Sequence, residues 1–232
     1  MQFADYGRLF ASSFDNTASI VVLDEKHSFS SCIHLVGHTT WVKIILPLPS
    51  SNQCISCDDK TIKVWDCENG SCVRTLTEHT STVASLAVHS NGRFFASAAY
   101  YQTVNIWLTD TLEVLLRIWF PDAALSLVFD EGNTLYAGVL NHGVMSCNTV
   151  DGEVGPVCIR STGRIDSLAL GETCLAVINA SHSHSHLHST LAETLDSLRT
   201  FSSVCIHTGQ RAYGRDCAVE AEITRATDAG AT

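Results

Sequence analysis

The residues best suited to bind a metal ion are four histidines that alternate with other residues in one short segment of the 232-residue chain. They are His182, His184, His186 and His188. In an extended segment, residues two apart share a face, so the four imidazoles could offer nitrogen ligands to zinc, nickel or copper. No nearby carboxylate or thiol completes a tetrahedral set, so we interpret residues 181–200 as a low-complexity insertion without a bound metal. A metal-binding protein that uses this tract is one alternative.

Cysteines are the second group with possible metal chemistry. The chain has 10 cysteines, and Cys54 and Cys57 have the spacing of half a zinc site. They lie in a predicted strand, where side chains three apart point to opposite faces, so we expect buried thiols rather than zinc ligands. The N-terminal sequence MQFADYGRLF has no basic region followed by an apolar run. We therefore expect a reducing compartment, the cytoplasm, with the nucleus as the alternative.

Catalytic motifs are missing from the sequence. It has no Gly-x-Ser-x-Gly elbow, no His-Glu-x-x-His, no glycine-rich phosphate loop and no dinucleotide fingerprint. Five acids are candidates for catalysis, but all fall in predicted turns: Asp15, Asp59, Asp122, Asp130 and Glu131. A structural role in the turns accounts for them, so no catalytic pair of carboxylates is needed to explain their presence. A net charge of −10 argues against nucleic acid or an anionic membrane as the main partner. We expect no enzyme activity, no cofactor, and other proteins as partners.

The elements that must position these residues repeat along the chain. Short apolar runs separated by turn residues predict β-strands throughout. Residues at the end of each predicted third strand mark the repeat, namely Leu23, Trp65, Trp107 and Cys147. The first two intervals are 42 residues and the third is 40 residues. A period near 40 residues predicts successive small antiparallel sheets.

One complete unit lies at 37–76. It has Gly37-His38, an apolar run from Trp41 to Leu46, the segment CISCDDKT, and IKVWD ending at Trp65 and Asp66. This pattern resembles a WD40 repeat, in which Gly-His opens a unit of four antiparallel strands and Trp-Asp closes the third strand.

The resemblance implies an all-β, WD40-type β-propeller that is incomplete, with about four to five blades. We expect a propeller-like domain at 1–213 with a His-rich insertion at 181–200, and a loose, disordered tail at 214–232. The expected blades are at about 1–36, 37–77, 78–118, 119–160 and 161–213.

A hydrogen-bond network is predicted inside the complete unit. In an antiparallel sheet, the loop before the first strand and the loop between the second and third strands open on one face, so His38 and Asp59 should meet. In WD40 repeats the network continues through Ser or Thr to the Trp indole, here Trp65. Cys57 occupies the Ser position, which predicts a looser network. We expect these residues to be structural rather than catalytic.

Neighbouring units contain parts of the same network. The candidate members are Ser13 and Asp15 in the first unit and His79 and Trp107 in the third. The first unit has no Gly-His. In the third unit, Ala99 and Tyr101 replace Ser and Asp, so we expect that no network forms there.

Large aromatic residues gather in loops that should share one face. They are Trp41, Tyr100, Tyr101, Trp119 and Phe120. Aromatic side chains on the rim of a rigid scaffold are typical anchors of a protein-binding surface, which is our prediction here. Trp41 and Phe120 could instead pack between blades.

The resemblance implies a non-catalytic scaffold that binds partner proteins through its top face and exposed edges, as a subunit of a larger assembly. An open ring leaves strand edges unpaired, so the propeller is a fragment, is completed by another polypeptide, or is small and divergent. We favour a partial or partner-completed propeller. The segments GHTTWVK and DDKTIKVWD are also similar to a repeat of the dynein-regulating lissencephaly proteins. The alternative is therefore a fragment of a larger WD40 regulator of microtubule motors or signalling.

Overall fold

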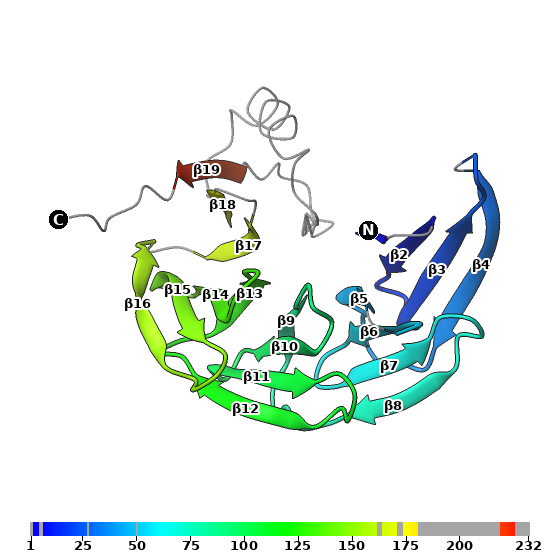
Figure 1. Ribbon diagram of the computed structural model, residues 1–232, viewed down its shortest axis with the longest axis horizontal. Helices are drawn as coiled ribbons and strands as arrows, with labels where there is room; N and C mark the ends of the chain where they lie inside the picture. Colours follow the sequence, from blue (N-terminus) through cyan, green and yellow to red (C-terminus); the bar gives the residue numbers. More distant parts are fainter. Residues whose placement is uncertain are drawn as a thin grey trace.

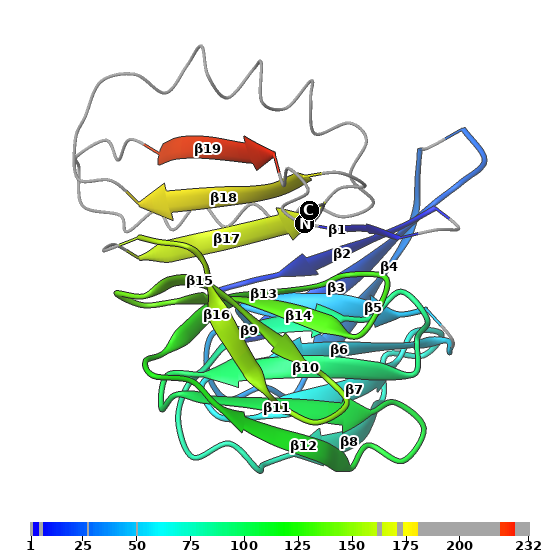
Figure 2. The ribbon, with the colours of Figure 1, turned by 60° about the vertical axis from the view of Figure 1, so that its left-hand side comes forward.

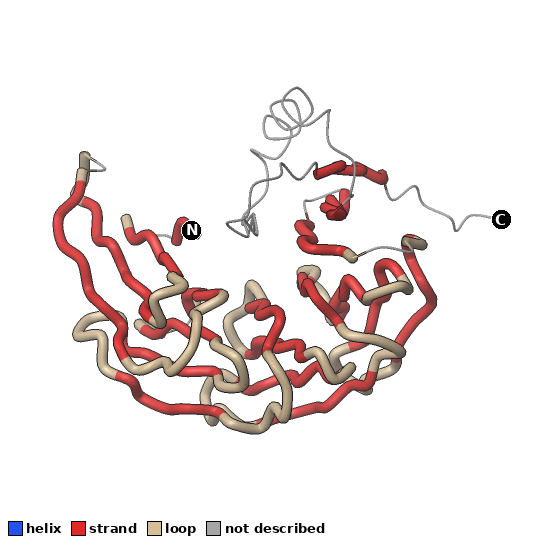
Figure 3. The backbone as a smooth tube through the Cα atoms, turned by 180° about the vertical axis from the view of Figure 1, so that it is seen from behind, coloured by secondary structure: helices blue, strands red, loops and turns tan. Residues whose placement is uncertain are grey.

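Five antiparallel sheets follow one another along the chain in the computed structural model and form an open arc (Figure 1). The structure describes residues 2–4, 7–26, 28–49, 51–161, 164–170, 174–180 and 219–225. All regular secondary structure in these ranges is β-strand (Figure 3). None of the described segments is a helix with the length and hydrophobicity needed to cross a bilayer.

Each of the first four sheets has four strands, ordered along the chain from the inner to the outer side of the arc (Figures 1 and 2). The first sheet contains β1 (Gln2–Ala4), β2 (Arg8–Ser12), β3 (Thr17–Leu23) and β4 (Phe29–Val36). The second contains β5 (Ile44–Leu48), β6 (Gln53–Cys57), β7 (Ile62–Asp66) and β8 (Cys72–Leu76). The third contains β9 (Val83–Val88), β10 (Phe94–Ala99), β11 (Thr103–Leu108) and β12 (Val114–Trp119). The fourth contains β13 (Ala124–Phe129), β14 (Thr134–Val139), β15 (Gly143–Asn148) and β16 (Val154–Ile159).

The fifth sheet has three strands, β17 (Ile165–Leu170), β18 (Cys174–Ala180) and β19 (Val219–Arg225). The prediction of a disordered tail at 214–232 was wrong for β19, which pairs with β18 along its whole length. The segment VEAEITR alternates apolar and polar residues, a strand pattern that its acidic composition concealed. The insertion expected at 181–200 and the rest of the predicted fifth blade, residues 201–213, lie outside the described residues.

The hydrophobic core is divided into clusters that lie between successive sheets. Between the first two sheets, Phe10 and Ile20 pack with Ile45 and Trp65. The next interface has Leu46 and Ile55 of the second sheet with Phe95 and Trp107 of the third. Similar clusters join the third sheet to the fourth and the fourth to the fifth. Each sheet is therefore stabilised mainly by the sheets on either side of it.

Among the described residues, a neighbouring sheet covers only one face of the first sheet. In β6 and β10 burial continues along the strand, because a neighbouring sheet lies on each side. In β3 it alternates, with Ala18 and Ile20 buried but Ser19 and Val21 half-buried. Leu9 pairs with Val21 on this open face, which borders the gap in the arc (Figure 1).

Serine side chains link the inner strands of successive sheets. The backbone N–H of Leu127 donates to Ser85 Oγ over 3.1 Å, and the N–H of Leu168 donates to Ser126 Oγ over 2.9 Å. Ser85 and Ser126 are 41 residues apart and each precedes a leucine. This repeated Ser-Leu pair was not predicted, although its spacing follows the predicted period.

We expect Ser85→Ala to lower the free energy of unfolding by about 1–3 kcal/mol, because the buried N–H of Leu127 would lose its acceptor. Urea unfolding measures this change. Ser31→Ala removes an exposed hydroxyl from β4 and is the matched control. Equal stability of the two variants would contradict a role for this hydrogen bond.

The half-covered face of the first sheet should make the isolated chain self-associate. Light scattering over a tenfold concentration range should show the mean mass rising with concentration. Val21→Lys should reduce the effect, because it places a charge on the open face, whereas Ser31→Lys on β4 should not. A monomer at every concentration would contradict this expectation.

Candidate functional site

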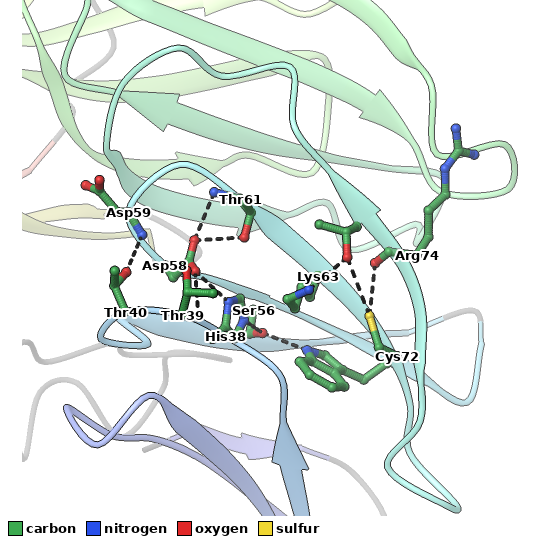
Figure 4. A network of polar contacts seen from close by, with 12 residues as sticks. His38, Thr39, Thr40, Ser56, Asp58, Asp59, Thr61, Lys63, Cys72 and Arg74 are labelled. Atoms are coloured by element: carbon green, nitrogen blue, oxygen red, sulfur yellow. Dashed lines mark hydrogen bonds and ion pairs between the residues drawn. The ribbon is translucent and has the colours of Figure 1, made fainter.

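A buried hydrogen-bond network lies between the loops and the core of the second sheet (Figure 4). The Trp65 indole N–H donates to Ser56 Oγ over 2.7 Å, and Ser56 Oγ lies 2.6 Å from His38 Nε2. The indole N–H can only donate, so Ser56 Oγ is its acceptor. Ser56 Oγ still has a hydrogen to donate and a second lone pair, so the imidazole tautomer sets the direction of its hydrogen bond with His38 Nε2.

Two residues predicted for this network, Cys57 and Asp59, lie outside it. Neighbouring residues on a strand face opposite sides, so a one-residue shift exchanges the two faces. Ser56 lies on the Trp65 side of β6, whereas Cys57 packs in the cluster facing the third sheet. The carboxylate that approaches His38 belongs to Asp58.

Asp59 has a different position, between two loops. Its backbone N–H donates to Thr40 Oγ1 over 3.1 Å, and its carbonyl accepts from the N–H of Val83 over 2.7 Å. Its carboxylate accepts a hydrogen bond from Thr82 Oγ1. Asp59 thus ties the β6–β7 turn to the segments that lead into β5 and β9.

Asp58 is held by its own turn. Oδ1 accepts from Thr61 N over 2.9 Å and from Thr61 Oγ1 over 2.8 Å. Burial would raise the pKa of Asp58, but the hydrogen bonds from Thr61 and the neighbouring His38 outweigh it and lower the pKa. Its Oδ2 lies 3.2 Å from His38 Nδ1, at an angle outside hydrogen-bond geometry. Burial lowers the pKa of His38, with Asp58 opposing it, so a neutral imidazole fits the network.

The third sheet contains a shorter version of the network, so the prediction that none forms there was wrong. The Trp107 indole donates to Ser97 Oγ over 2.7 Å, and Ser97 Oγ lies 2.6 Å from His79 Nε2. Ala99 stands two residues beyond Ser97, where the second sheet has Asp58 beyond Ser56. Burial, with a smaller effect of the Arg117 charge, lowers the pKa of His79 to about 4.

In the first sheet, Ser13 and Asp15 form an exposed turn rather than a buried network. The N–H of Asp15 donates to Ser13 Oγ over 3.3 Å, and that of Thr17 donates to Asp15 Oδ1 over 3.0 Å. Hydrogen bonds from the side chains of Thr17 and Ser13 lower the pKa of Asp15. These contacts shape the β2–β3 turn.

Above these networks lies the upper face, which we define as the loops joining second to third strands and those joining one sheet to the next. The antiparallel order of the strands places all these loops on the same side. Six of the ten exposed large hydrophobic residues in the described ranges lie in or at the ends of these loops. They are Phe14, Val36, Trp41, Tyr100, Tyr101 and Trp119.

The predicted aromatic residues divide into an exposed group and a buried one. Trp41 is 60% exposed, Tyr101 67% and Trp119 65%, and Tyr100 is also exposed. Phe120 is 3% exposed and packs in the core between the third and fourth sheets, so its placement in a binding surface was wrong. Trp119 ends β12, and the next side chain along the chain turns inward.

The exposed aromatics form two groups on the upper face. Phe14 and Trp41 pack edge to face, with ring centroids 5.3 Å apart. Tyr100, Tyr101 and Trp119 border a shallow depression of about 430 Å³. Thr80, Gln102 and Thr103 complete its lining.

Metal ligation finds no support among the residues that the structure describes. They contain no cluster of three or more potential His, Cys, Asp or Glu ligands. Cys54 packs in the cluster facing the first sheet and Cys57 in the one facing the third, so the two thiols point apart. A hydrogen bond with Cys67 and burial raise the pKa of the Cys54 thiol. The four histidines at 182–188 lie outside the described residues.

Two segments of the chain match a known family. Residues 29–66 and 70–107 match the family described as WD domain, G-beta repeat. Each segment ends with the third strand of a sheet and contains the histidine, serine and tryptophan of one buried network. These two segments are WD40 repeats. WD40 domains are generally protein-interaction scaffolds and are typically non-catalytic.

Curated relatives match this chain over part of their length. The nuclear distribution protein PAC1 of Arthroderma benhamiae and that of Trichophyton verrucosum are each 31% identical over 110 residues. These matches cover 44% of this chain and 24% of each relative. The U3 small nucleolar RNA-associated protein 15 homolog of Gallus gallus is 29% identical over 131 residues, covering 56% of this chain and 24% of that protein. The chain thus spans about a quarter of the length of these relatives.

The low pKa of His79 predicts that acid destabilises the fold. A histidine with a pKa of about 4 when folded and about 6.5 when unfolded favours the folded state above pH 6.5. This contribution, up to about 3 kcal/mol, should disappear as the pH falls from 6.5 to 4. Urea unfolding at several pH values should show a weaker pH dependence for His79→Asn than for the unmodified chain. His142→Asn, which replaces an exposed histidine, is the control. Identical pH dependence in all three proteins would contradict the prediction.

Proposed function

We propose that this chain is a non-catalytic scaffold that binds partner proteins through its upper face and exposed edges, as a subunit of a larger assembly. The observation that carries the proposal is the concentration of exposed large hydrophobic residues on the upper face. Aromatic side chains that remain exposed beside a packed core are typical of protein-binding sites.

The hydrogen bonds of the upper-face loops support this proposal. The N–H of Tyr100 donates to the carbonyl of Thr82 over 3.0 Å, and the N–H of Phe120 donates to the carbonyl of Gln102 over 2.8 Å. The Ser97 network lies beneath the same loops. Loops fixed in this way lose little conformational entropy when a partner binds.

The open arc supports a second contact with a partner. Leu9 and Val21 are half-buried on the open face of the first sheet. Elsewhere in this fold, apolar faces between sheets are buried by the neighbouring blade. We propose that blades from another polypeptide, or from a longer form of this chain, cover that face.

A narrower alternative is that the chain is part of a larger WD40 regulator of microtubule motors or signalling. The match to nuclear distribution protein PAC1 favours it, because the matched region includes 110 residues at 31% identity. We propose a cytoplasmic location, with the nucleus as the alternative, to which the match with a nucleolar RNA-associated protein adds weight.

Affinity capture from cell extract, read by mass spectrometry, tests the scaffold proposal. Replacing both Tyr100 and Tyr101 by alanine should reduce specifically captured proteins about tenfold or more, because exposed aromatic anchors contribute a large share of binding energy. The melting temperature should stay within about 2 °C, since both side chains are exposed.

Leu115→Ala is the matched control for the capture experiment. Leu115 is an exposed hydrophobic residue at the other end of β12 from Trp119, away from the upper face. Capture that Leu115→Ala weakens as much as the double tyrosine substitution would contradict binding through the upper face.

A further inference from the structure

The depression on the upper face has an aromatic wall on two sides. Tyr101 and Trp119 both line it, and they come from the β10–β11 loop and the end of β12. Thr103 begins β11 two residues after Tyr101, and it pairs with Trp119 in the β11–β12 register. The hollow is therefore built on adjacent strands of one sheet, and its walls are fixed relative to each other.

Both rings have free faces. Tyr101 is 67% exposed and Trp119 is 65% exposed. Within the part of the chain that the structure describes, neither ring has a stacking partner or a cation above it. An indole and a phenol ring that face water can each attract a cation through the negative charge of the ring face.

A cation already lies over a third ring of this group. Lys43 Nζ is 5.8 Å from the centroid of the Tyr100 ring and donates a hydrogen bond to the carbonyl of Val83 over 3.3 Å. The chain itself thus shows that an ammonium group is accommodated against this aromatic cluster. The Tyr100 ring already contacts Lys43, so the rings of Tyr101 and Trp119 are the ones that an external ligand can contact.

The three loops that supply or adjoin most of the lining residues have acidic but no basic residues. The loops at 77–82, 100–102 and 120–123 contain Glu78 and Asp122 and neither Lys nor Arg. Two cations of neighbouring segments already have partners: Lys43, which precedes β5, lies over the Tyr100 ring, and Arg117 Nε donates to Asn105 Oδ1 over 3.1 Å. With a net charge of −10 for the whole chain, the field at the depression favours a positively charged partner.

From these features we infer that the depression between Tyr101 and Trp119 binds a cationic side chain, arginine or lysine, of a partner protein. The guanidinium or ammonium group stacks against the two rings, and the hydroxyl and amide oxygens of Thr80, Gln102 and Thr103 are available to its N–H donors. This inference rests on the proposed scaffold function and specifies the chemistry of its partner.

Fluorescence anisotropy with three labelled peptides tests the inference. The probe is Gly-Ser-Arg-Gly-Arg-Ser-Gly, and the matched peptides contain citrulline or glutamate in place of both arginines. Citrulline keeps the shape of arginine but has no charge. We expect the arginine peptide to bind at least about fivefold more tightly than the citrulline peptide, with no measurable binding of the glutamate peptide.

Substitutions then locate the binding. Tyr101→Ala and Trp119→Ala should each weaken binding of the arginine peptide about two- to fivefold, and Tyr101→Phe should retain it, because the ring remains. Leu115→Ala on the same strand as Trp119 should leave binding unchanged. Melting temperatures of the variants show that each one is folded.

Equal binding of the arginine and citrulline peptides, or unchanged binding after loss of both rings, would overturn the inference. Its failure can be separated from failure of the scaffold proposal. If protein capture depends on Tyr100 and Tyr101 but the chain shows no preference for the arginine peptide, the scaffold proposal stands and only the cationic ligand is overturned. Loss of tyrosine-dependent capture would overturn both.

Discussion

Face-to-face packing between successive sheets is the interaction on which the rest of this structure depends. A single sheet of four short strands buries too little apolar surface to be stable alone, and here every sheet shares its core with a neighbour. Trp65 and Trp107 are fully buried at two of these interfaces, and each packs against the preceding sheet. The Trp107 ring also stacks on Phe95 with centroids 5.8 Å apart.

The polar networks follow from that packing. Once an indole ring is buried between two sheets, its N–H needs an acceptor, and Ser56 or Ser97 supplies one from the adjacent strand. The histidine then satisfies the serine hydroxyl and fixes the loop that precedes the first strand of the sheet. Gly37 stands beside His38 with a φ of 152°, a backbone conformation that L side chains rarely adopt, whereas a Cβ there would make only an ordinary contact with the Trp65 ring at 3.4 Å. The glycine of the opening Gly-His pair is thus explained by its backbone conformation, and the histidine by the network with Ser56 and Trp65.

The second and third sheets differ in whether a carboxylate lies beside the histidine of the network. Asp58 is anchored by Thr61 and approaches His38, whereas Ala99 leaves His79 without a carboxylate on that side. Burial without this compensating charge explains why the pKa of His79 is lowered to about 4. The loops above both networks remain in place because backbone hydrogen bonds, such as that between Tyr100 and Thr82, also hold them. A rigid frame with exposed aromatic side chains on its loops is suited to binding rather than to reaction chemistry.

Local sequence patterns were sufficient to predict the class of fold and the positions of the first four sheets. The interval of about 40 residues and the alternation of apolar runs with turns are local properties, and the Gly-His and Trp-Asp pairs mark the sheet boundaries. Which of two neighbouring residues faces which side of a sheet follows from packing between sheets, and the local patterns did not predict it. Strand register places Ser56 in the second-sheet network instead of Cys57, and Asp58 beside His38 instead of Asp59. It also places Ser97 in the network of the third sheet. A shift of one residue would reverse the face in each case. The burial of Phe120 beside exposed Trp119, and the pairing of β19 with β18, depend on contacts distant in the chain, which a local pattern does not contain.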